Sequence, residues 1–192
     1  MDHVHNLFNS LNSIMNYIKN NQPDDAEVFL IRFSKLMRIV LEQSEKEYIS
    51  IGEEINTLKN YIELEKGRLQ HTFECNISVD ESMDIENTLL PPLILQPFVE
   101  NSIWHGIAHM SGKGAIDINI TSEGQIVKFT VKDNGTARSF DTQKNTISLG
   151  IKITKERIKM MDENNIISNP VSVQDEKTGY ISEIFIPLKL NY

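Results

Sequence analysis

The spacing of the apolar residues changes near position 70, and this change constrains the fold more than any other feature of the chain. Before it, apolar residues recur every three or four positions, which is typical of helices that pack on one face. After it, they alternate with polar residues, which predicts strands at 73–79, 115–120, 126–131, 171–173 and 180–186. Helical segments at about 92–109 and 149–164 separate these strands. We therefore predict an α+β chain, in which an N-terminal helical hairpin precedes an α/β sandwich with a mixed sheet and helices on one face.

The part before the change divides into helical segments. The first spans about 5–20, and the second carries an apolar stripe from Phe29 to Val40. A third helix begins at Ser50, because Ser50 and Glu53 have the spacing of a capping box, and we expect its charged residues to face water. We divide the chain into a helical region, residues 1–70, and a second domain, residues 71–192.

Composition and charge exclude several classes of function. Of the 192 residues, 40% are hydrophobic and 24% are charged, which is ordinary for a globular protein. The 19 basic and 27 acidic residues give a net charge of −8, so we expect no broad basic surface and no direct binding of nucleic acid. The single cysteine, Cys75, has no partner for an internal disulfide, which fits a reducing, cytoplasmic setting.

The sequence predicts no membrane span and no signal peptide. Its most apolar stretch, 89–99, contains prolines and is well below the ~20 apolar residues that a transmembrane helix needs. The first residues lack the basic and apolar regions of a signal peptide. Because the first amphipathic pattern has almost nothing before it, we expect a longer protein, whose contact with a membrane would lie in upstream segments.

Two polar clusters could carry chemistry. In segment 95–106, Glu100, Asn101 and His105 lie toward one edge of an apolar helix, since four positions separate Asn101 from His105. Polar groups on so apolar a helix are costly unless they are satisfied or used, although an ordinary surface edge has the same pattern. In the second cluster a strand runs into Asp133-Asn134-Gly135, which by itself is a common turn.

The order of these segments resembles a known ATP-binding fold. A helix with Glu100-Asn101, a strand that ends in Asp133-Asn134-Gly135, and a helix that opens with Ser148-Leu149-Gly150-Ile151 are similar to the N box and the two glycine boxes of histidine kinases, gyrase and Hsp90. Segment 5–14 resembles the phospho-acceptor helix of LytS-like sensor histidine kinases, most closely at 7–12. Segments 61–68 and 93–106 are also typical of that family, so the resemblance covers nearly the full chain.

This resemblance implies the cytoplasmic kinase core of a two-component sensor. Such a core uses ATP and Mg²⁺ to phosphorylate its own histidine, and it passes the phosphoryl group to an aspartate of a response regulator. The matching histidine is His5, and a neutral imidazole has a nitrogen lone pair that can accept a phosphoryl group. The resemblance also implies a homodimer formed by the helical region, a response regulator of the LytTR DNA-binding class, and a membrane-anchored bacterial sensor.

The resemblance further implies the roles of residues in the nucleotide site. Asn101 would hold Mg²⁺ through its amide oxygen, and Asp133 would accept a hydrogen bond from the adenine amino group. Gly135 would let the backbone approach the base, and Gly150 would leave N–H groups at a helix N-terminus open to phosphate. His105 and Glu100 would border the phosphate end, with His105 rather than Glu100 as the direct contact.

Departures from the family pattern leave an alternative open. Ala137 and Ser148 stand where the family usually has glycine, and Ile153 stands where it has asparagine. These changes favour a pseudokinase, which keeps the fold and signals by conformational change without phosphoryl transfer. ATP hydrolysis of the gyrase and Hsp90 type is a weaker alternative. Those ATPases carry a water-activating glutamate one turn before the asparagine, where this chain has Pro97.

Overall fold

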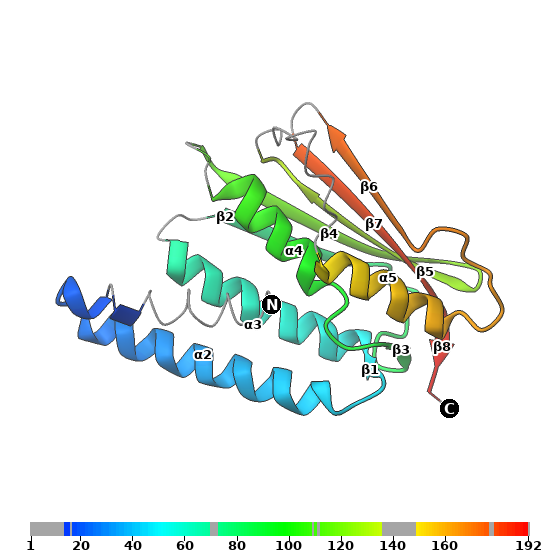
Figure 1. The fold of residues 1–192 in the computed structure, drawn as a ribbon, viewed down its shortest axis with the longest axis horizontal. Coiled ribbons are helices and arrows are strands. Elements are labelled where there is room, and N and C mark those ends of the chain that lie inside the picture. Colours follow the sequence, from blue (N-terminus) through cyan, green and yellow to red (C-terminus); the bar gives the residue numbers. More distant parts are fainter. Residues whose placement is uncertain are drawn as a thin grey trace.

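The computed structural model describes residues 14–15, 17–69, 73–108, 110, 112–135, 149–176 and 179–191. Its helices cover one face of a mixed sheet, which confirms the predicted α+β class (Figure 1). Helix α2 (Pro23–Ser44) lies on the side of α3 (Ile51–Leu69) that is turned away from the sheet (Figure 1).

Helix α2 (Pro23–Ser44) follows the predicted apolar stripe. Pro23 occupies its first turn, where a missing N–H costs no hydrogen bond, and the acids Asp24 and Asp25 follow at the positive end of the helix dipole. The buried face packs on α3, and it consists of Ala26, Phe29, Leu36 and Gln43. Exposed apolar residues remain on other parts of α2, and they are Val28, Leu30, Ile31 and Leu41.

Helix α3 (Ile51–Leu69) begins at the predicted capping box. The Ser50 hydroxyl accepts a hydrogen bond from the N–H of Glu53 at 3.1 Å, and the N–H of Ser50 donates to the Glu53 carboxylate at 2.9 Å. Two backbone N–H groups that the helix itself leaves open are thereby satisfied.

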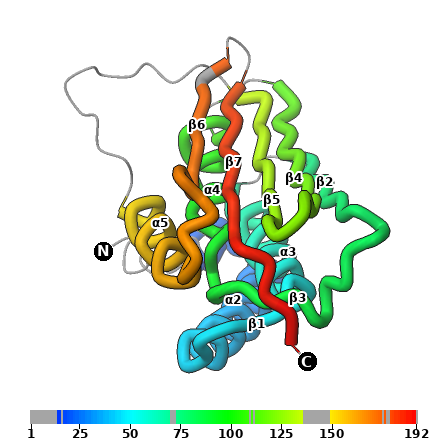
Figure 2. Tube along the Cα trace, turned by 90° about the vertical axis from the view of Figure 1, so that its right-hand side faces the viewer, coloured from blue at the N-terminus to red at the C-terminus, as the bar shows by residue number. Residues whose placement is uncertain are grey.

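The main sheet of the described residues has five strands in the order β2-β4-β5-β7-β6. β2 runs parallel to β4, and the other neighbours are antiparallel. Figure 2 shows these strands side by side, with α3 and α4 behind them. The strands are β2 (Phe73–Val79), β4 (Gly114–Glu123), β5 (Ile126–Asp133), β6 (Val171–Glu176) and β7 (Gly179–Pro187).

A second, three-stranded sheet within the described residues was not predicted. It consists of β1 (Ile49–Ser50), β3 (Thr88–Leu90) and β8 (Lys189–Leu190), in the order β1-β3-β8. Strands of two or three residues are too short to show a period. Because β1 leads directly into α3, this sheet attaches α3 to the C-terminal part of the chain. The domain boundary near residue 70 stays a prediction.

The helix predicted at 92–109 is shorter and less regular than expected. Helix α4 (Gln96–Asn101) continues directly into the π-helical turn η1 (Ser102–Ile107). Two prolines precede it, and Leu93 has a φ of 60°, so the chain is not helical there. Buried Phe98, Val99 and Ile103 fix α4 and η1 in the core, while α5 (Leu149–Met161) packs against α4.

Candidate functional site

Asp133, the last residue of β5, is the buried carboxylate of the candidate site, with an exposed fraction of only 2%. Its Oδ1 atom accepts a hydrogen bond from the backbone N–H of Gly135 at 2.9 Å. This bond turns the chain sharply after the strand and aims the carboxyl group at η1. A carboxylate held in this way is suited to accept hydrogen bonds from amino groups of a ligand.

Glycines give the Asp133 carboxylate its surroundings. A Cβ atom on Gly106, in η1, would lie 2.8 Å from Asp133 Oδ1, and a Cβ atom on Gly135 would overlap the Cα atom of Gly106. At Gly179, where φ is 144°, a Cβ atom would overlap the carbonyl oxygen of Asp133. The backbones at positions 106 and 135 and the Asp133 carboxylate thus lie so close together that only glycine, which has no Cβ atom, fits at these two positions. The sequence pattern alone predicts no role for Gly106 or Gly179, although Gly106 lies at the end of the 95–106 segment.

Asn134 fixes the loop that follows β5. Its Oδ1 atom accepts from the backbone N–H of Ala115 at 2.7 Å, and its Nδ2 atom donates to the carbonyl of Lys113 at 3.1 Å. Asn134 therefore fastens the end of β5 to the start of β4. The Asp-Asn-Gly sequence is more than a surface turn, because its asparagine holds the loop while its aspartate is buried.

The turn η1 places the other polar candidates near this carboxylate. The backbone N–H of Ala108 donates to the carbonyl of Ile103 at 2.8 Å, which is the five-residue step of a π-helix. Asn101 is half-buried just before this turn, and His105 is exposed within it, next to Gly106. Since η1 packs against β4, β5 and β7, the structure brings Asn101, His105, Asp133 and Gly135 to one region of the molecule. Single π-helical turns occur frequently at functional sites.

The remaining predicted residues have different positions. Glu100 is half-buried, and its Oε1 atom accepts a hydrogen bond from Gln96 Nε2 at 2.7 Å, so it has a structural contact on its own helix. Gly150 lies in the first turn of α5, the helix that packs against α4. His5, Ala137 and Ser148 lie outside the described residues.

A second polar cluster, formed by Tyr61, Glu65, Arg68 and Trp104, joins α3 to η1. Arg68 donates twice to Glu65 Oε2, from Nε at 2.9 Å and from Nη2 at 2.7 Å. The same guanidinium lies over the Trp104 ring, 3.5 Å from its centroid. Burial raises the pKa of Glu65, and the Arg68 guanidinium opposes this shift. Burial also raises the pKa of the Tyr61 phenol, with further contributions from the negative charges of Glu65 and Glu100.

A third buried carboxylate, that of Glu54, holds the loop that leads into α4. Its oxygens accept hydrogen bonds from the N–H groups of Leu93 and Leu95, each at 2.8 Å. Arg157 of α5 donates to the carbonyl of Pro92 at 2.6 Å. Burial raises the pKa of Glu54, while the backbone N–H groups and Arg157 lower it.

The expectation that the charged residues of α3 face water is wrong for Glu54 and Glu65, which are 2% and 4% exposed.

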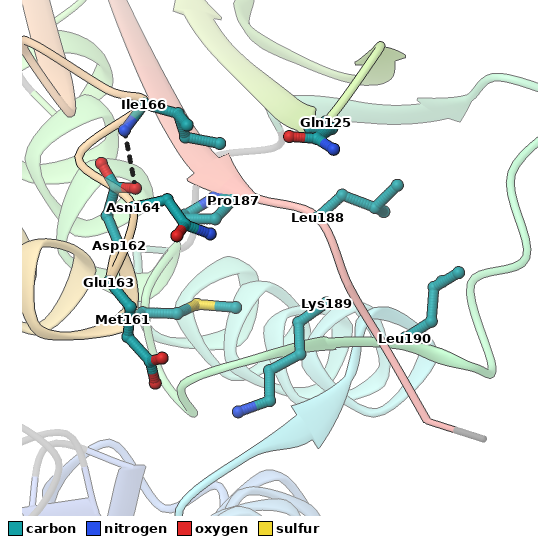
Figure 3. Close-up of a pocket in the computed structure, with 10 residues that line it drawn as sticks. All are labelled: Gln125, Met161, Asp162, Glu163, Asn164, Ile166, Pro187, Leu188, Lys189 and Leu190. Atoms are coloured by element: carbon teal, nitrogen blue, oxygen red, sulfur yellow. Dashed lines mark hydrogen bonds between the residues drawn. The ribbon is translucent and has the colours of Figure 1, made fainter.

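A cavity of about 450 Å³ lies at the opposite end of β5 from Asp133. Figure 3 shows that the end of α5 with the turn after it and the end of β7 with the segment after it line this cavity, together with Gln125. The Asp162 carboxylate beside it accepts from the N–H groups of Ile166 and Ile167 at 2.9 and 2.8 Å. Asp162 thus stabilises the turn after α5, and this cavity is separate from the candidate site.

The surroundings of Asp133 fit the base of an adenine nucleotide. The Asp133 carboxylate suits an exocyclic amino group, and the glycine backbones beside it leave space that any Cβ atom would fill. Among the described residues there is no cluster of three histidine, cysteine or acidic side chains that could hold a metal ion. In the same part of the chain, no helix is both long and apolar enough to cross a bilayer.

Comparison with known sequences gives a consistent result. The sequence model of the histidine kinase family matches residues 3–73. Sensor histidine kinase YpdA of Escherichia coli is 36% identical over 131 residues, which are 68% of this chain and 22% of YpdA. BtsS of the same organism is 29% identical over 155 residues, 81% of this chain and 27% of BtsS. LytS of Oceanobacillus iheyensis is 33% identical over 132 residues, 68% of this chain and 22% of LytS. The chain spans about a quarter of these relatives.

Solved structures share the fold. The kinase domain of the blue-light activated histidine kinase EL346 from Erythrobacter litoralis has a TM-score of 0.54 at 18% identity, and the match covers 91% of this chain and 84% of that domain. Acinetobacter baumannii histidine kinase AdeS has a TM-score of 0.53 at 14% identity, over 97% and 95% of the two chains. The relatives that are 36% and 33% identical over 68% of this chain show that it belongs to the histidine kinase family.

Proposed function

We propose that this chain is the kinase core of a two-component sensor, which transfers the γ-phosphoryl group of ATP to His5 and from there to an aspartate of a response regulator. The observation that carries the proposal is the buried carboxylate of Asp133, set between the backbones of Gly106 and Gly135. Family membership and the motif at 5–14 support the choice of acceptor.

Asp133 would select the base. Its carboxylate offers only acceptors, so it favours a base that presents an amino group over one that presents a carbonyl oxygen. Gly106 and Gly135 would form the walls beside the base, because neither carries a side chain. Burial strengthens this discrimination, since a mismatched acceptor would face the carboxylate away from water.

Asn101, His105 and Gly150 would serve the phosphate end. Asn101 lies five residues before Gly106, which contacts Asp133, and its amide oxygen is a hard ligand suited to Mg²⁺. When bound, Mg²⁺ neutralises developing charge on the phosphate oxygens. Gly150 in the first turn of α5 would offer backbone N–H groups to phosphate.

His5 would act as the nucleophile. A neutral imidazole nitrogen attacks the γ-phosphorus, a nitrogen–phosphorus bond forms, and the bond from phosphorus to the β–γ bridging oxygen breaks, so that ADP leaves with that electron pair. Water as the nucleophile is disfavoured, because Pro97 occupies the position from which a carboxylate would activate it.

The proposed partners follow from the family and from exposed surface. Ile31 and Leu41 on α2 are 62% and 67% exposed, and a second copy of the helical region would cover such residues in a homodimer. The phosphoryl acceptor would be a response regulator of the LytTR DNA-binding class. The relatives are much longer than this chain, and we propose that it is the cytoplasmic portion of a membrane-anchored sensor.

Calorimetry with ATP and Mg²⁺ tests the nucleotide site. Asp133→Asn keeps the shape of the side chain but replaces an acceptor oxygen by a donor, so affinity should fall by about 1–3 kcal/mol, or about 5- to 150-fold. Asp117→Asn is the matched control, because Asp117 is exposed on β4 and bonds Asn76 at 3.0 Å. If the two variants bind ATP with equal affinity, Asp133 does not contact the nucleotide.

The pseudokinase is the second candidate, and the residues at 137 and 148 favour it. If these substitutions weaken phosphate binding, the double reversion Ala137→Gly with Ser148→Gly should tighten binding of a non-hydrolysable ATP analogue. Adenosine affinity should stay the same, because adenosine lacks the phosphates. An unchanged analogue affinity would mean that the substitutions are neutral, and the pseudokinase would lose its main support.

A further inference from the structure

We propose that Arg68 is a positioning residue for the phosphate end of the nucleotide site: held by Glu65 and stacked on Trp104, it fixes the turn η1 that carries His105 and follows Asn101. The proposal rests on the proposed function, because it concerns how strongly the site binds the phosphate–Mg²⁺ end of ATP.

The contacts of Arg68 are specific in direction. Two of its N–H groups converge on one oxygen of Glu65, at 2.9 and 2.7 Å, while the flat face of the guanidinium lies 3.5 Å from the centre of the Trp104 ring. The side chains of Arg68 and Glu65 are only 11% and 5% exposed. A rigid planar cation is therefore clamped at its edge by α3 and at its face by η1.

The position of Trp104 explains how the contacts of Arg68 reach the polar residues of the candidate site. Trp104 comes three residues after Asn101 and directly before His105, so fixing its ring fixes the backbone between them. Trp104 lies within the π-helical turn η1, so its contact with Arg68 acts directly on this irregular turn. Arg68 thus acts on the part of the chain that carries Asn101 and His105.

The other end of η1 is fixed independently. Gly106 lies against Asp133 and Gly135, and η1 packs on strands of the main sheet through buried residues such as Ile103. These contacts do not involve Arg68. Loss of the Arg68 clamp should therefore change the Asn101–His105 end while leaving the Asp133 end in place. Loss of an ion pair that only stabilises the fold would weaken binding of the adenosine part and of the phosphate part alike.

The test compares Arg68→Met with Lys66→Met. The Met variants keep much of each apolar stem and remove the charge. Lys66 is the matched control, because it also pairs with a glutamate of α3, Glu63 at 3.1 Å, but this pair is more exposed and the ring beside Lys66 is that of Phe73. Calorimetry measures the affinity of each full chain for a non-hydrolysable ATP analogue with Mg²⁺, and separately for adenosine. Urea unfolding shows that each variant is folded in the assay.

We expect Arg68→Met to weaken binding of the analogue with Mg²⁺ by about tenfold, a difference of about 1.4 kcal/mol, because the turn next to Asn101 and His105 is no longer fixed. Adenosine affinity should stay within about twofold, a difference of about 0.4 kcal/mol. Trp104 is the only tryptophan of the chain, so its fluorescence reports on η1 directly. The change in emission on binding of the analogue should differ between Arg68→Met and the control.

Arg68→Lys is the second variant, and it serves if Arg68→Met does not fold. Lysine keeps the charge and can lie over the ring, but it lacks the fork that donates twice to Glu65. It should lose analogue affinity in the same direction and by less. Equal losses for analogue and adenosine, or no loss for either, would overturn the proposal for Arg68 alone. If the unmodified chain binds neither ligand, the proposed function fails and the role of Arg68 fails with it.

Discussion

The carboxylate of Glu54 accepts a hydrogen bond from the backbone N–H of Leu93 at 2.8 Å, although 39 positions separate the two residues. The same carboxylate accepts from Leu95 at 2.8 Å, so α3 holds the short loop before α4 at its middle and at its end. Leu93 has a φ of 60°, which is unusual for a residue with a side chain, and Glu54 satisfies the N–H that this conformation turns inward.

Glu54→Gln should destabilise the chain. An amide presents one acceptor and one donor, so one of the two backbone N–H groups would face another donor in a buried place. We expect a loss of about 1–3 kcal/mol in the free energy of unfolding, measured with urea. Glu63→Gln is the control on the same helix, because its side chain is 54% exposed, and it should change stability by less than about 0.5 kcal/mol. A loss of equal size in the control would show that the buried contacts of Glu54 contribute nothing special.

The cost of Glu54→Gln should depend on pH. Because burial raises the pKa of Glu54, the folded chain binds its proton more tightly than the unfolded chain does. The stability that the protonated carboxyl contributes is therefore complete below the ordinary pKa of an unfolded glutamate, and it decreases as pH rises through the raised pKa. The difference in unfolding free energy between wild type and Glu54→Gln should be largest at acidic pH. A difference that increases with pH would mean that the folded-state pKa is lowered.

Gly106→Ala should damage the adenine end of the site. The new Cβ atom would lie 2.8 Å from Asp133 Oδ1, so either the carboxylate or η1 must move. We expect the affinity for adenosine to fall about tenfold, in keeping with an overpacking cost of about 1–3 kcal/mol. Gly112→Ala is the control, since a Cβ atom there meets no other atom within 4 Å. Calorimetry on both variants checks this, and an unchanged adenosine affinity in Gly106→Ala would place the base elsewhere.

Asn101→Ala should weaken binding of the phosphate end of the nucleotide and leave binding of the base unchanged. Loss of the amide oxygen should lower the affinity for a non-hydrolysable ATP analogue with Mg²⁺ by about tenfold or more. Adenosine affinity should not change, because Asp133 and the glycines beside it are untouched. Asn56→Ala, at an exposed position of α3, controls for the loss of an asparagine. Equal losses of analogue and adenosine binding would show that Asn101 supports the fold of the site and not the phosphates.

The regular elements could be predicted because their pattern is local. Strand β2 has the predicted bounds, 73–79, since its burial alternates from residue to residue, and the capping box at Ser50 and Glu53 forms as its spacing indicates. The family and the α+β class are confirmed as well. These signals lie within a few residues of one another, so a sequence shows them directly.

The rest depends on contacts between distant segments. Glu54 and Glu65 look like surface charges on a helix. Glu54 is buried where backbone N–H groups from the loop before α4 satisfy it. Glu65 pairs with Arg68 on its own helix, and this pair is buried where Trp104 of η1 packs on the Arg68 guanidinium. The π-helical form of η1 and the role of Gly106 depend on strands that pack against the turn. From the sequence alone, a charged residue such as Glu54 or Glu65 is expected to face solvent, because the segments that pack against it in the fold are not visible there.

The transfer of a phosphoryl group to His5 is the central claim, and labelling tests it most directly. The full chain is incubated with Mg²⁺ and ATP radiolabelled at the γ-phosphate, beside His5→Gln and Asp133→Asn. The account predicts label on His5 that is stable to base and released by acid, as expected of phosphohistidine, and a loss of that label in both variants. A chain that binds ATP in calorimetry but carries no label, or one whose label persists in His5→Gln, would contradict it.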